Sequence, residues 1–524
     1  MSTTPPDSSA PRVLIVGAGP VGLFLACLLR RHGIAFRIVE QEGGPCVEAR
    51  ATQIQARSLE MLAQEGLIEV FLAAGNVLTE GQLFGADGQL LKTIPFTQVA
   101  SPYPFHLSIA QSRTERLLLD HLTGAGQIVE WNRRLVAFEQ WEEGVLVLLR
   151  DQDGREERAA FDYLVACDGA HSRVREGLAM ALRGSDYPAT FTIADVEIEG
   201  PLPQDKITVY SAPQATTFFA PLADSRTLFV ADVLDHQLAA DKSVPSLEDL
   251  HEVLRVAGVE HFRIVDQPNW CGYFHCHRRL ARHFRKGRVF LAGDAAHVQS
   301  PAGGLGLNTG WQDAANLAWK LALVVSGQAP EGLLKSYHAE RRAVVKQSLK
   351  LSDQMHEAIF QRHDNFLERA LRSLADFFAH HGLSHPEALT PDLTWVSYRD
   401  SKIVREDHGS AGGAAWAAAP QAGDRAPDGA LFALSQGTPR HRLLLFHGAA
   451  GDPALEDLTR NHEALIETWT IESEDDPDGK LHQAYGVEGP CLYLIRPDGH
   501  IAYRSPTPDA AALGRYLAAV FHKT

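Results

Sequence analysis

Residues 12–40 read RVLIVGAGPVGLFLACLLRRHGIAFRIVE, and this stretch decides the fold of the first half of the chain. It predicts a buried strand, a turn with the spacing Gly17-x-Gly19-x-x-Gly22, an apolar helix, and a second strand that ends at Glu40. In such a unit the first glycine makes the tight turn, the second admits a pyrophosphate, and the third lets helix and strand pack closely. The helix N-terminus offers N–H groups to the phosphates, and a carboxylate at position 40 suits ribose hydroxyls better than a 2′-phosphate. The stretch therefore predicts a dinucleotide site for FAD or NAD.

The composition is that of a globular protein with several domains. A chain of 524 residues is too long for one core, and its hydrophobic fraction of 45% is ordinary. The formal net charge of −16 argues against nucleic acid or an anionic membrane surface as the main partner. The N-terminal MSTTPPDSSA has no apolar core of a signal peptide, and no stretch resembles a membrane helix. Six cysteines without CxxC spacing fit reduced thiols, so we expect a cytoplasmic protein.

Two later strands also end in an acid beside a glycine. The run FDYLVAC is followed by Asp168-Gly169, with a helix expected to start at Ser172. The run RVFLAG is followed by Asp294, a glycine-rich loop at 301–304 and an apolar helix. The spacing Gly304-x-Gly306 is not a second dinucleotide fingerprint, because Thr309 replaces the third glycine. A glycine-rich loop that enters a helix still offers backbone N–H groups to a flat anionic ligand with no side chain in the way.

These motifs together resemble a known family, the class A flavoprotein aromatic hydroxylases, which are single-component FAD-dependent monooxygenases. The motifs that carry the resemblance are GAGPVG at 17–22, CDGAHS at 167–172, GDAAH at 293–297 and NTG at 308–310. Further similar stretches are 49–67, 108–122 and 336–342. The resemblance covers about residues 11–400.

The resemblance implies which residues hold FAD. Glu40 would bind the adenosine ribose, and Arg50 and Gln111 would contact the cofactor. Asp168 would lie in the motif linked to both FAD and NAD(P)H, and Asp294 would bind the ribityl chain. Backbone in the 306–308 segment would face the pyrimidine edge of the flavin, with Pro301 bordering the reaction site. The complete set of expected cofactor-binding residues is Gly17, Gly19, Pro20, Gly22, Glu40, Arg50, Gln111, Asp168, Asp294, Pro301, Gly306, Leu307 and Asn308.

The expected fold class is α/β, a Rossmann-like FAD-binding domain with an inserted β-sheet substrate domain, a helical segment and a C-terminal thioredoxin-like domain. The expected divisions are 11–185 with 280–345 for FAD binding, 186–279 for the β-rich substrate domain, 346–408 helical, 409–429 linker, and 430–524 thioredoxin-like. The last part lacks CxxC, so a structural or dimerisation role, within a homodimer, is favoured over redox exchange.

The sequence says less about the residues that bind the substrate than about those that bind the cofactor. Aromatic residues in the β-rich part could line a substrate pocket, although ordinary core positions are favoured for each of them: Tyr210, Phe218, Phe219 and Phe229. The segment WCGYFHCHRRLA at 270–281 contains two cysteines and two histidines, but strand spacing places them too far apart for one zinc ion. We expect no metal site. A base that activates a phenol stays unassigned among four candidates, His106, Tyr210, His275 and His277.

The family resemblance implies the reaction. NAD(P)H, as NADPH or NADH, would reduce FAD, and the flavin C4a-hydroperoxide formed with O₂ would hydroxylate a phenolic or other aromatic substrate. One alternative is oxygenation of a polycyclic, antibiotic-like molecule by hydroxylation or Baeyer-Villiger ring insertion. Another is a non-catalytic FAD-binding protein. A plain NAD dehydrogenase is disfavoured, because it leaves the glycine-rich loop without a purpose.

Overall fold

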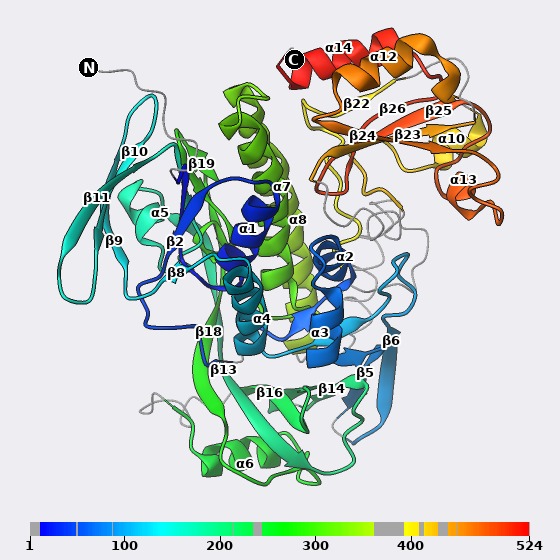
Figure 1. Cartoon of the computed structure of the whole chain (residues 1–524). Coiled ribbons are helices and arrows are strands. Elements are labelled where there is room, and N and C mark those ends of the chain that lie inside the picture. Colours follow the sequence, from blue (N-terminus) through cyan, green and yellow to red (C-terminus); the bar gives the residue numbers. More distant parts are fainter. Residues whose placement is uncertain are drawn as a thin grey trace.

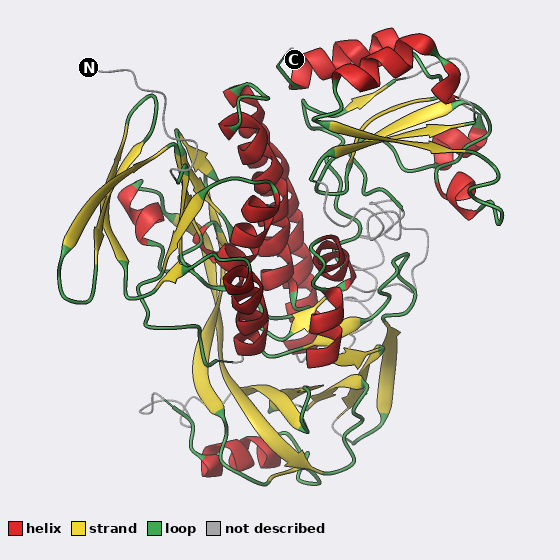
Figure 2. Cartoon of the chain, viewed as in Figure 1, coloured by secondary structure: helices red, strands yellow, loops and turns green. Residues whose placement is uncertain are grey.

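The structure is a computed structural model that describes residues 11–48, 51–85, 87–212, 214–233, 244–360, 392–407, 413–427, 439–447 and 449–522. Figure 2 shows that helices and strands are mixed throughout, as expected for an α/β chain. In the described part of the chain, no helix is both long enough and apolar enough to cross a membrane.

The first half of the chain is built on a mainly parallel six-stranded sheet. Its strands, in spatial order, are β19 (Arg285–Lys286), β20 (Val289–Leu291), β12 (Tyr163–Ala166), β1 (Val13–Val16), β2 (Phe36–Val39) and β8 (Val129–Glu130). The three central strands β1, β12 and β20 come from distant parts of the sequence and are buried at every position. Such all-apolar strands are typical of a parallel sheet covered on both faces.

Helices cover this sheet and connect it to the rest of the molecule. They are α1 (Pro20–Arg31), α2 (Ala56–Gln64), α3 (Ile68–Ala74), α4 (Gln111–Gly124), α5 (Arg173–Gly177), α7 (Leu305–Val325) and α8 (Lys335–Phe360). The helix expected after the second motif is α5, and the Ser172 side chain caps it by accepting a hydrogen bond from the Arg175 N–H. The two long helices α7 and α8 run side by side through the centre of Figure 1.

Helices α1 and α7 approach each other closely at small residues. A Cβ on Gly310 would lie 2.6 Å from Val21 Cγ2, and a Cβ on Gly293 would lie 2.9 Å from the same methyl group. The absence of side chains at these glycines therefore lets α7 and the turn before it pack directly onto α1. The first and third motifs of the sequence meet here.

A second, nine-stranded sheet forms the lower part of Figure 1. Its strands are β21 (His297–Val298), β18 (Trp270–Ala281), β13 (Leu182–Glu199), β16 (Arg226–Val233), β15 (Ala215–Pro221), β14 (Lys206–Ser211), β5 (Glu80–Gly85) and β6 (Leu90–Pro95), with β17 (Arg263–Ile264) beside β13. Helix α6 (Leu247–Val256) covers its outer face and begins with a capping box between Ser246 and Asp249.

Two strands of this sheet, β5 and β6, lie outside residues 186–279, which were expected to form the β-rich domain. Strands β5 and β6 precede position 185, yet β5 pairs with β14 in parallel over residues 80–85. Parallel pairing requires a long crossover connection, which local sequence patterns do not reveal. The strands of the nine-stranded sheet therefore come from three separate segments of the chain, which carry β5 and β6, β13 to β18, and β21.

Two small three-stranded sheets complete the first 400 residues. One consists of β3 (Gln53–Ile54), β7 (His106–Ser108) and β4 (Asn76–Leu78), and the other of β11 (Glu156–Phe161), β10 (Val145–Arg150) and β9 (Arg134–Gln140).

The C-terminal part contains a five-stranded sheet with helices on both faces. Its strands are β22 (Arg405–Glu406), β26 (Ile501–Ser505), β25 (Cys491–Ile495), β23 (His441–Phe446) and β24 (Ile466–Ile471), and its helices are α10 (Ala414–Ala418), α12 (Pro453–Asn461), α13 (Lys480–Ala484) and α14 (Ala510–Val520). The turn sequence Pro497-Asp498-Gly499 between two apolar runs predicts a hairpin, and the structure confirms it, because β25 and β26 pair in antiparallel across this turn. The thioredoxin-like assignment of this part stays a prediction, and residues 361–391 of the expected helical segment lie outside the described residues.

Candidate active site

The three glycine and acid motifs meet at one edge of the six-stranded sheet. Val16, Ala166 and Leu291 are register neighbours at the carboxyl ends of β1, β12 and β20. Each strand leads directly into one of the motifs. In open α/β sheets, ligands bind outside the carboxyl ends of parallel strands, so the topology brings the expected cofactor residues to the edge where a dinucleotide binds.

In the first glycine turn, two of the three glycines have no room for a side chain, and the third faces open space. Gly17 has a φ of 104°, and a Cβ there would lie 2.3 Å from the Cys167 carbonyl oxygen. A Cβ on Gly22 would lie 1.9 Å from the Gly17 carbonyl oxygen. At Gly19, no atom of the described residues lies within 4 Å of such a Cβ, and the N-terminus of α1, which begins at Pro20, has no side-chain cap. The open space and the uncapped N–H groups fit a pyrophosphate.

Glu40 lies beside this turn, where the ribose of a dinucleotide is expected. Its Oε2 accepts a hydrogen bond from the Ala18 N–H at 2.8 Å, and its Oε1 accepts one from the Glu42 N–H at 3.1 Å. The carboxylate at the end of β2 is thus held against the glycine turn.

Asp168 stands at the second motif, directly after β12. Its Oδ2 accepts a hydrogen bond from the Val174 N–H at 3.2 Å, while Oδ1 is buried without a partner among the described residues. Burial raises the pKa of the Asp168 carboxyl group. An unpaired buried carboxylate oxygen is costly to a protein on its own and fits a site that is completed by a ligand.

Gln111 is the first residue of α4 and belongs to a small polar cluster. Its Nε2 donates to Glu115 Oε1 at 3.0 Å and lies 3.6 Å from Cys46 Sγ. The other oxygen of Glu115 accepts a hydrogen bond from the Cys46 N–H at 2.8 Å. The cluster ties the segment after β2 to the start of α4. Arg50 lies outside the described residues.

The third motif forms an exposed rim around the start of α7. Asp294 lies in a short 3-10 helix (η1, Gly293–Ala295), and both Asp294 and Pro301 are exposed. Gly304, with a φ of 64°, precedes α7 without a side-chain cap, and no atom of the described residues is near a Cβ on Gly306. Gly306 and Leu307 are half-buried, in the first turn of α7. The arrangement leaves a helix N-terminus and bare backbone available to a flat ring.

Asn308 has a role that the sequence did not indicate. Its side chain is fully buried and joins the loop to β3, because Nδ2 donates to the carbonyl oxygens of Gln53 at 2.9 Å and Gly304 at 2.7 Å. Its Oδ1 accepts a hydrogen bond from the Gln55 N–H at 3.0 Å. The Asn308 side chain therefore braces the glycine-rich loop.

A buried network around Asp313 was missed by the sequence analysis. Asp313 Oδ2 accepts hydrogen bonds from the Gly293 N–H at 3.0 Å and from His297 Nε2 at 2.8 Å, and Arg341 Nε donates to Oδ1 at 2.7 Å. Burial acts to raise the pKa of Asp313, but His297 and Arg341 outweigh it and hold the pKa below its ordinary value. Three members of the network stand in stretches that carry the family resemblance, Gly293 and His297 in the GDAAH motif and Arg341 in residues 336–342, but nothing in the sequence links them to Asp313.

The aromatic candidates of the nine-stranded sheet are divided between its two faces. Tyr210, Phe219 and Phe229 pack with the residues of α6 on the outer face. Phe218 points the other way and packs beside Phe96, on the side of the FAD-binding part. The first three residues therefore pack in the core under α6, as the core interpretation predicts, and Phe218 packs on the opposite face of the sheet.

The histidine candidates are divided in the same way. His275 is exposed, and His277 Nδ1 pairs with the exposed carboxylate of Asp186 at 2.8 Å. Both alternate along β18 with Phe274 and Cys276, which pack on the inner face. His106 lies instead on β7, buried beside Phe96. Within the described residues, no three of the His, Cys, Asp and Glu side chains are grouped so that they could hold a metal ion.

A buried ionic network joins α7 and α8 to the C-terminal sheet. Arg496, next to β25, donates to both oxygens of Glu340 at 2.9 and 3.0 Å, and Lys320 Nζ donates to Glu340 Oε2 at 2.7 Å. Trp319 Nε1 donates to Asp498 Oδ2 at 3.1 Å. Burial acts to raise the pKa of Glu340, but Arg496 and Lys320 outweigh it and lower the pKa to about 2.

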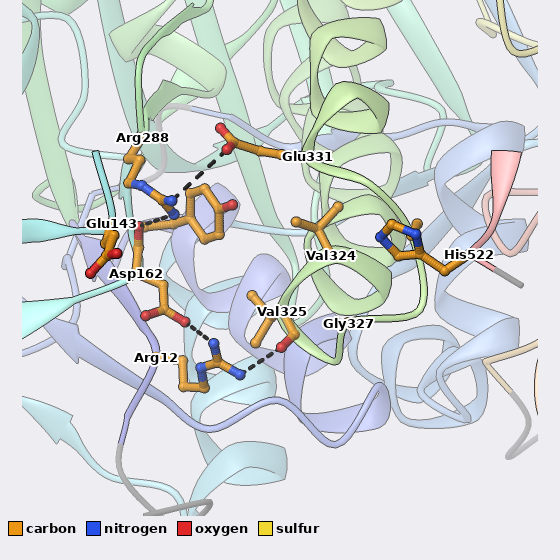
Figure 3. A pocket seen from close by; sticks show the side chains of 11 residues that line it. Arg12, Glu143, Asp162, Arg288, Val324, Val325, Gly327, Glu331 and His522 are labelled. Atoms are coloured by element: carbon orange, nitrogen blue, oxygen red, sulfur yellow. Dashed lines mark hydrogen bonds and ion pairs between the residues drawn. The ribbon is translucent and has the colours of Figure 1, made fainter. Parts of the chain in front are cut away.

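A cavity of about 330 Å³ lies at the opposite end of the parallel sheet (Figure 3). Arg12, which precedes β1, pairs with Asp162 at 2.5 Å, and Arg288, which precedes β20, lies 3.8 Å from Glu331. These charged groups are paired with one another and lie at the amino ends of the strands. The cavity is therefore separate from the edge where the three motifs meet.

Comparison with known proteins identifies the family. A family model described as an FAD binding domain matches residues 11–352. The chain is 33% identical to 6-methylpretetramide 4-monooxygenase of Streptomyces rimosus, over 98% of this chain and 94% of that protein, and 32% identical to pentachlorophenol 4-monooxygenase of Sphingobium chlorophenolicum, over 96% and 95%. The structure of anhydrotetracycline hydroxylase from Streptomyces rimosus matches with a TM-score of 0.72 and 28% identity, over 97% of this chain and 99% of that one. Because the family model covers more than half of the chain and both relatives align along nearly its whole length, the chain belongs to the FAD-dependent aromatic monooxygenases.

Proposed function

We propose that this monooxygenase hydroxylates a phenolic ring of a polycyclic substrate, with O₂ and with NADH or NADPH as cosubstrates. The observation that carries the proposal is the meeting of three glycine and acid turns at one sheet edge, beside the inner face of the nine-stranded sheet. Two relatives that align along most of the chain are named for anhydrotetracycline, which supports a polycyclic substrate. The name of the pentachlorophenol relative supports a phenolic ring.

The cofactor residues are proposed from the geometry of the site. The Gly19 turn and the start of α1 hold the pyrophosphate, and Glu40 holds the adenosine ribose. Asp294 would bind the ribityl chain, Asp168 would lie in the motif that serves both FAD and NAD(P)H, and backbone at the start of α7 would hold the flavin ring. When bound, FAD supplies hydride acceptance and the reaction with O₂. The protein supplies orientation, exclusion of water and a helix N-terminus that stabilises negative charge.

The experiment that tests the proposal measures the anaerobic rate of flavin reduction in the holoenzyme. NADH and NADPH are each mixed with the enzyme in the presence and absence of single phenols and polycyclic phenols. We expect one pyridine nucleotide and one ring class to accelerate reduction, and product mass after aerobic turnover to increase by one oxygen atom. Ring connectivity of the product separates hydroxylation from Baeyer-Villiger insertion.

A matched pair of variants tests the cofactor assignment. Asp294→Ala should weaken FAD binding by about tenfold, as expected for the loss of a hydrogen bond to a charged group. Asp151→Ala, in the exposed turn after β10, is the control and should leave FAD binding unchanged. A flavin that no nicotinamide reduces with any aromatic compound would contradict the proposed function.

A further inference from the structure

Strand β7 presents two polar side chains that the site described above does not use. His106 and Ser108 lie on one face of the strand, and Leu107 lies on the other, where it packs into the core of the FAD-binding part. His106 is 3% exposed and Ser108 is fully buried. Both are therefore held in the interior by the fold.

The face that carries these two residues lies between the glycine-rich loop on one side and the nine-stranded sheet on the other. Ser108 is the register partner of Gln53, whose carbonyl oxygen accepts the hydrogen bond from Asn308 in α7. Ser108 is also the partner of Asn76, which donates to the Gln204 carbonyl oxygen just before β14. The strand on one side of β7 is thus attached to the glycine-rich loop, and the strand on the other side is attached to the nine-stranded sheet.

The polar atoms on this face have no partners. Nδ1 and Nε2 of His106 and Oγ of Ser108 are buried and make no hydrogen bond with any described residue. Leaving a buried polar group unpaired costs about 1–3 kcal/mol, and native structures seldom keep such groups without a ligand or water to satisfy them. Two neighbouring orphaned side chains on one strand face therefore point to a polar ligand group.

Aromatic rings border the same position. The His106 ring stacks on Phe96 with a centroid distance of 3.9 Å and an interplanar angle of 8°. Phe96 belongs to an apolar cluster that Phe218 and Ile359 join from β15 and the end of α8. A flat ring that lies against these side chains would bring a substituent hydroxyl to the polar atoms of β7.

We propose that His106 and Ser108 bind the hydroxyl group of the aromatic substrate, while Phe96 and Phe218 contact its ring. This inference rests on the proposed function and assigns the phenol-binding residue that the sequence left open among four candidates. The other three are excluded by their positions, because Tyr210 packs under α6 and His275 and His277 lie on the outer face of β18.

The protonation state of His106 suits this role. Burial lowers the pKa of His106 to about 3, so the ring is neutral at physiological pH. A neutral imidazole carries one N–H donor and one acceptor nitrogen. The acceptor nitrogen takes the hydrogen bond from the substrate O–H, and the Ser108 hydroxyl can donate to the same oxygen.

The test compares two ligands that differ only in the hydroxyl group. Binding of 2-hydroxyanthraquinone and of anthraquinone to the holoenzyme is followed by the change in flavin absorbance, in the parent enzyme and in His106→Phe. Phenylalanine keeps the stacking on Phe96 and removes only the hydrogen bond. We expect the dissociation constant of 2-hydroxyanthraquinone to rise about tenfold and that of anthraquinone to change by less than about twofold. His106→Gln, which keeps a donor and an acceptor, should recover part of the difference, and His275→Phe should behave as the parent.

Each outcome is decisive. Equal effects of His106→Phe on both ligands, or no effect on either, would overturn the assignment of His106 while the flavin reduction experiment still supports the proposed function. If no aromatic compound stimulates flavin reduction in the parent enzyme, the proposed function fails and this inference fails with it. FAD content and the unfolding temperature of each variant show whether the fold is retained.

Discussion

Arg341 Nε donates a hydrogen bond to Asp313 Oδ1 over 2.7 Å, and both side chains are completely buried. Through the other oxygen of Asp313, which accepts the Gly293 N–H, this pair connects α8 to the turn that carries the third motif. The position of the turn that precedes the glycine-rich loop is therefore fixed by two fully buried charges on α7 and α8.

Removal of the Asp313 carboxylate should loosen this turn. In Asp313→Ala the guanidinium of Arg341 stays buried without its counter-charge, which costs about 3–5 kcal/mol. We expect a lower urea midpoint of the apoprotein and faster release of FAD on dilution, measured by the recovery of flavin fluorescence. Asp457→Ala removes an exposed pair with Arg460 and should change stability by less than about 1 kcal/mol. Equal urea midpoints for the two variants would contradict this account.

The glycine turn allows stability and cofactor binding to be separated. Gly22→Ala forces a Cβ to within 1.9 Å of the Gly17 carbonyl oxygen, and such overpacking should destabilise the apoprotein by about 1–3 kcal/mol or more. Gly19→Ala meets open space and has a φ of −72° that alanine adopts readily, so the apoprotein should keep its stability and lose FAD affinity. The two quantities are measured by urea unfolding of the apoproteins and by FAD titration. A Gly19→Ala enzyme with parental FAD affinity would show that the pyrophosphate lies elsewhere.

Phe218 and Phe219 are neighbours in sequence with opposite roles. Phe219→Ala opens a cavity under α6 and should cost about 3–5 kcal/mol of stability, with little change in the preference among aromatic substrates. Phe218→Ala, on the inner face, should change that preference and destabilise the protein less, because the side chain is only half-buried. Thermal unfolding and the ratio of reduction rates for two phenols of different size distinguish them. The reverse pattern would mean that the substrate binds on the α6 side.

The Glu340 network predicts a dependence of stability on pH. The pKa of Glu340 is about 2 in the folded protein and 4.5 in the unfolded reference. A carboxyl group with a depressed folded pKa contributes stability above the unfolded value and loses it as the pH falls through the folded value. The free energy of unfolding should therefore fall between pH 4.5 and 2, and less steeply in Glu340→Gln than in the parent. Glu456→Gln, an exposed substitution on α12, is the control. Parallel pH curves for the parent and Glu340→Gln would rule out this contribution.

The sequence predicted those parts of the fold that depend on local pattern. The strand, glycine turn and helix at 12–31, the helix cap at Ser172 and the hairpin at 497–499 each follow from a few adjacent residues. The meeting of the three motifs could also be anticipated, because parallel strands place their carboxyl ends on one edge.

The features that the sequence did not reveal depend on contacts between distant residues. The pairing of β5 with β14 joins segments more than 100 residues apart, and Asp313 finds its three partners on other elements. The face on which Phe218 or Phe219 lies depends on strand register, where a shift of one residue exchanges the two. His106 could be proposed from its residue type, but only its burial and its missing partners separate it from the two other candidate histidines, His275 and His277.

The buried ion pair between Glu340 and Arg496 limits which domain exchanges this protein can tolerate during evolution. The buried contacts on the two sides of this interface depend on each other. Glu340 on α8 is neutralised by Lys320 of α7 and by Arg496 of the C-terminal part, and Asp498 of that part accepts a hydrogen bond from Trp319 of α7. A C-terminal domain exchanged with that of another monooxygenase would leave buried ions unmatched unless the residues of α7 and α8 were exchanged with it. We therefore expect the C-terminal part and the helices α7 and α8 to change together.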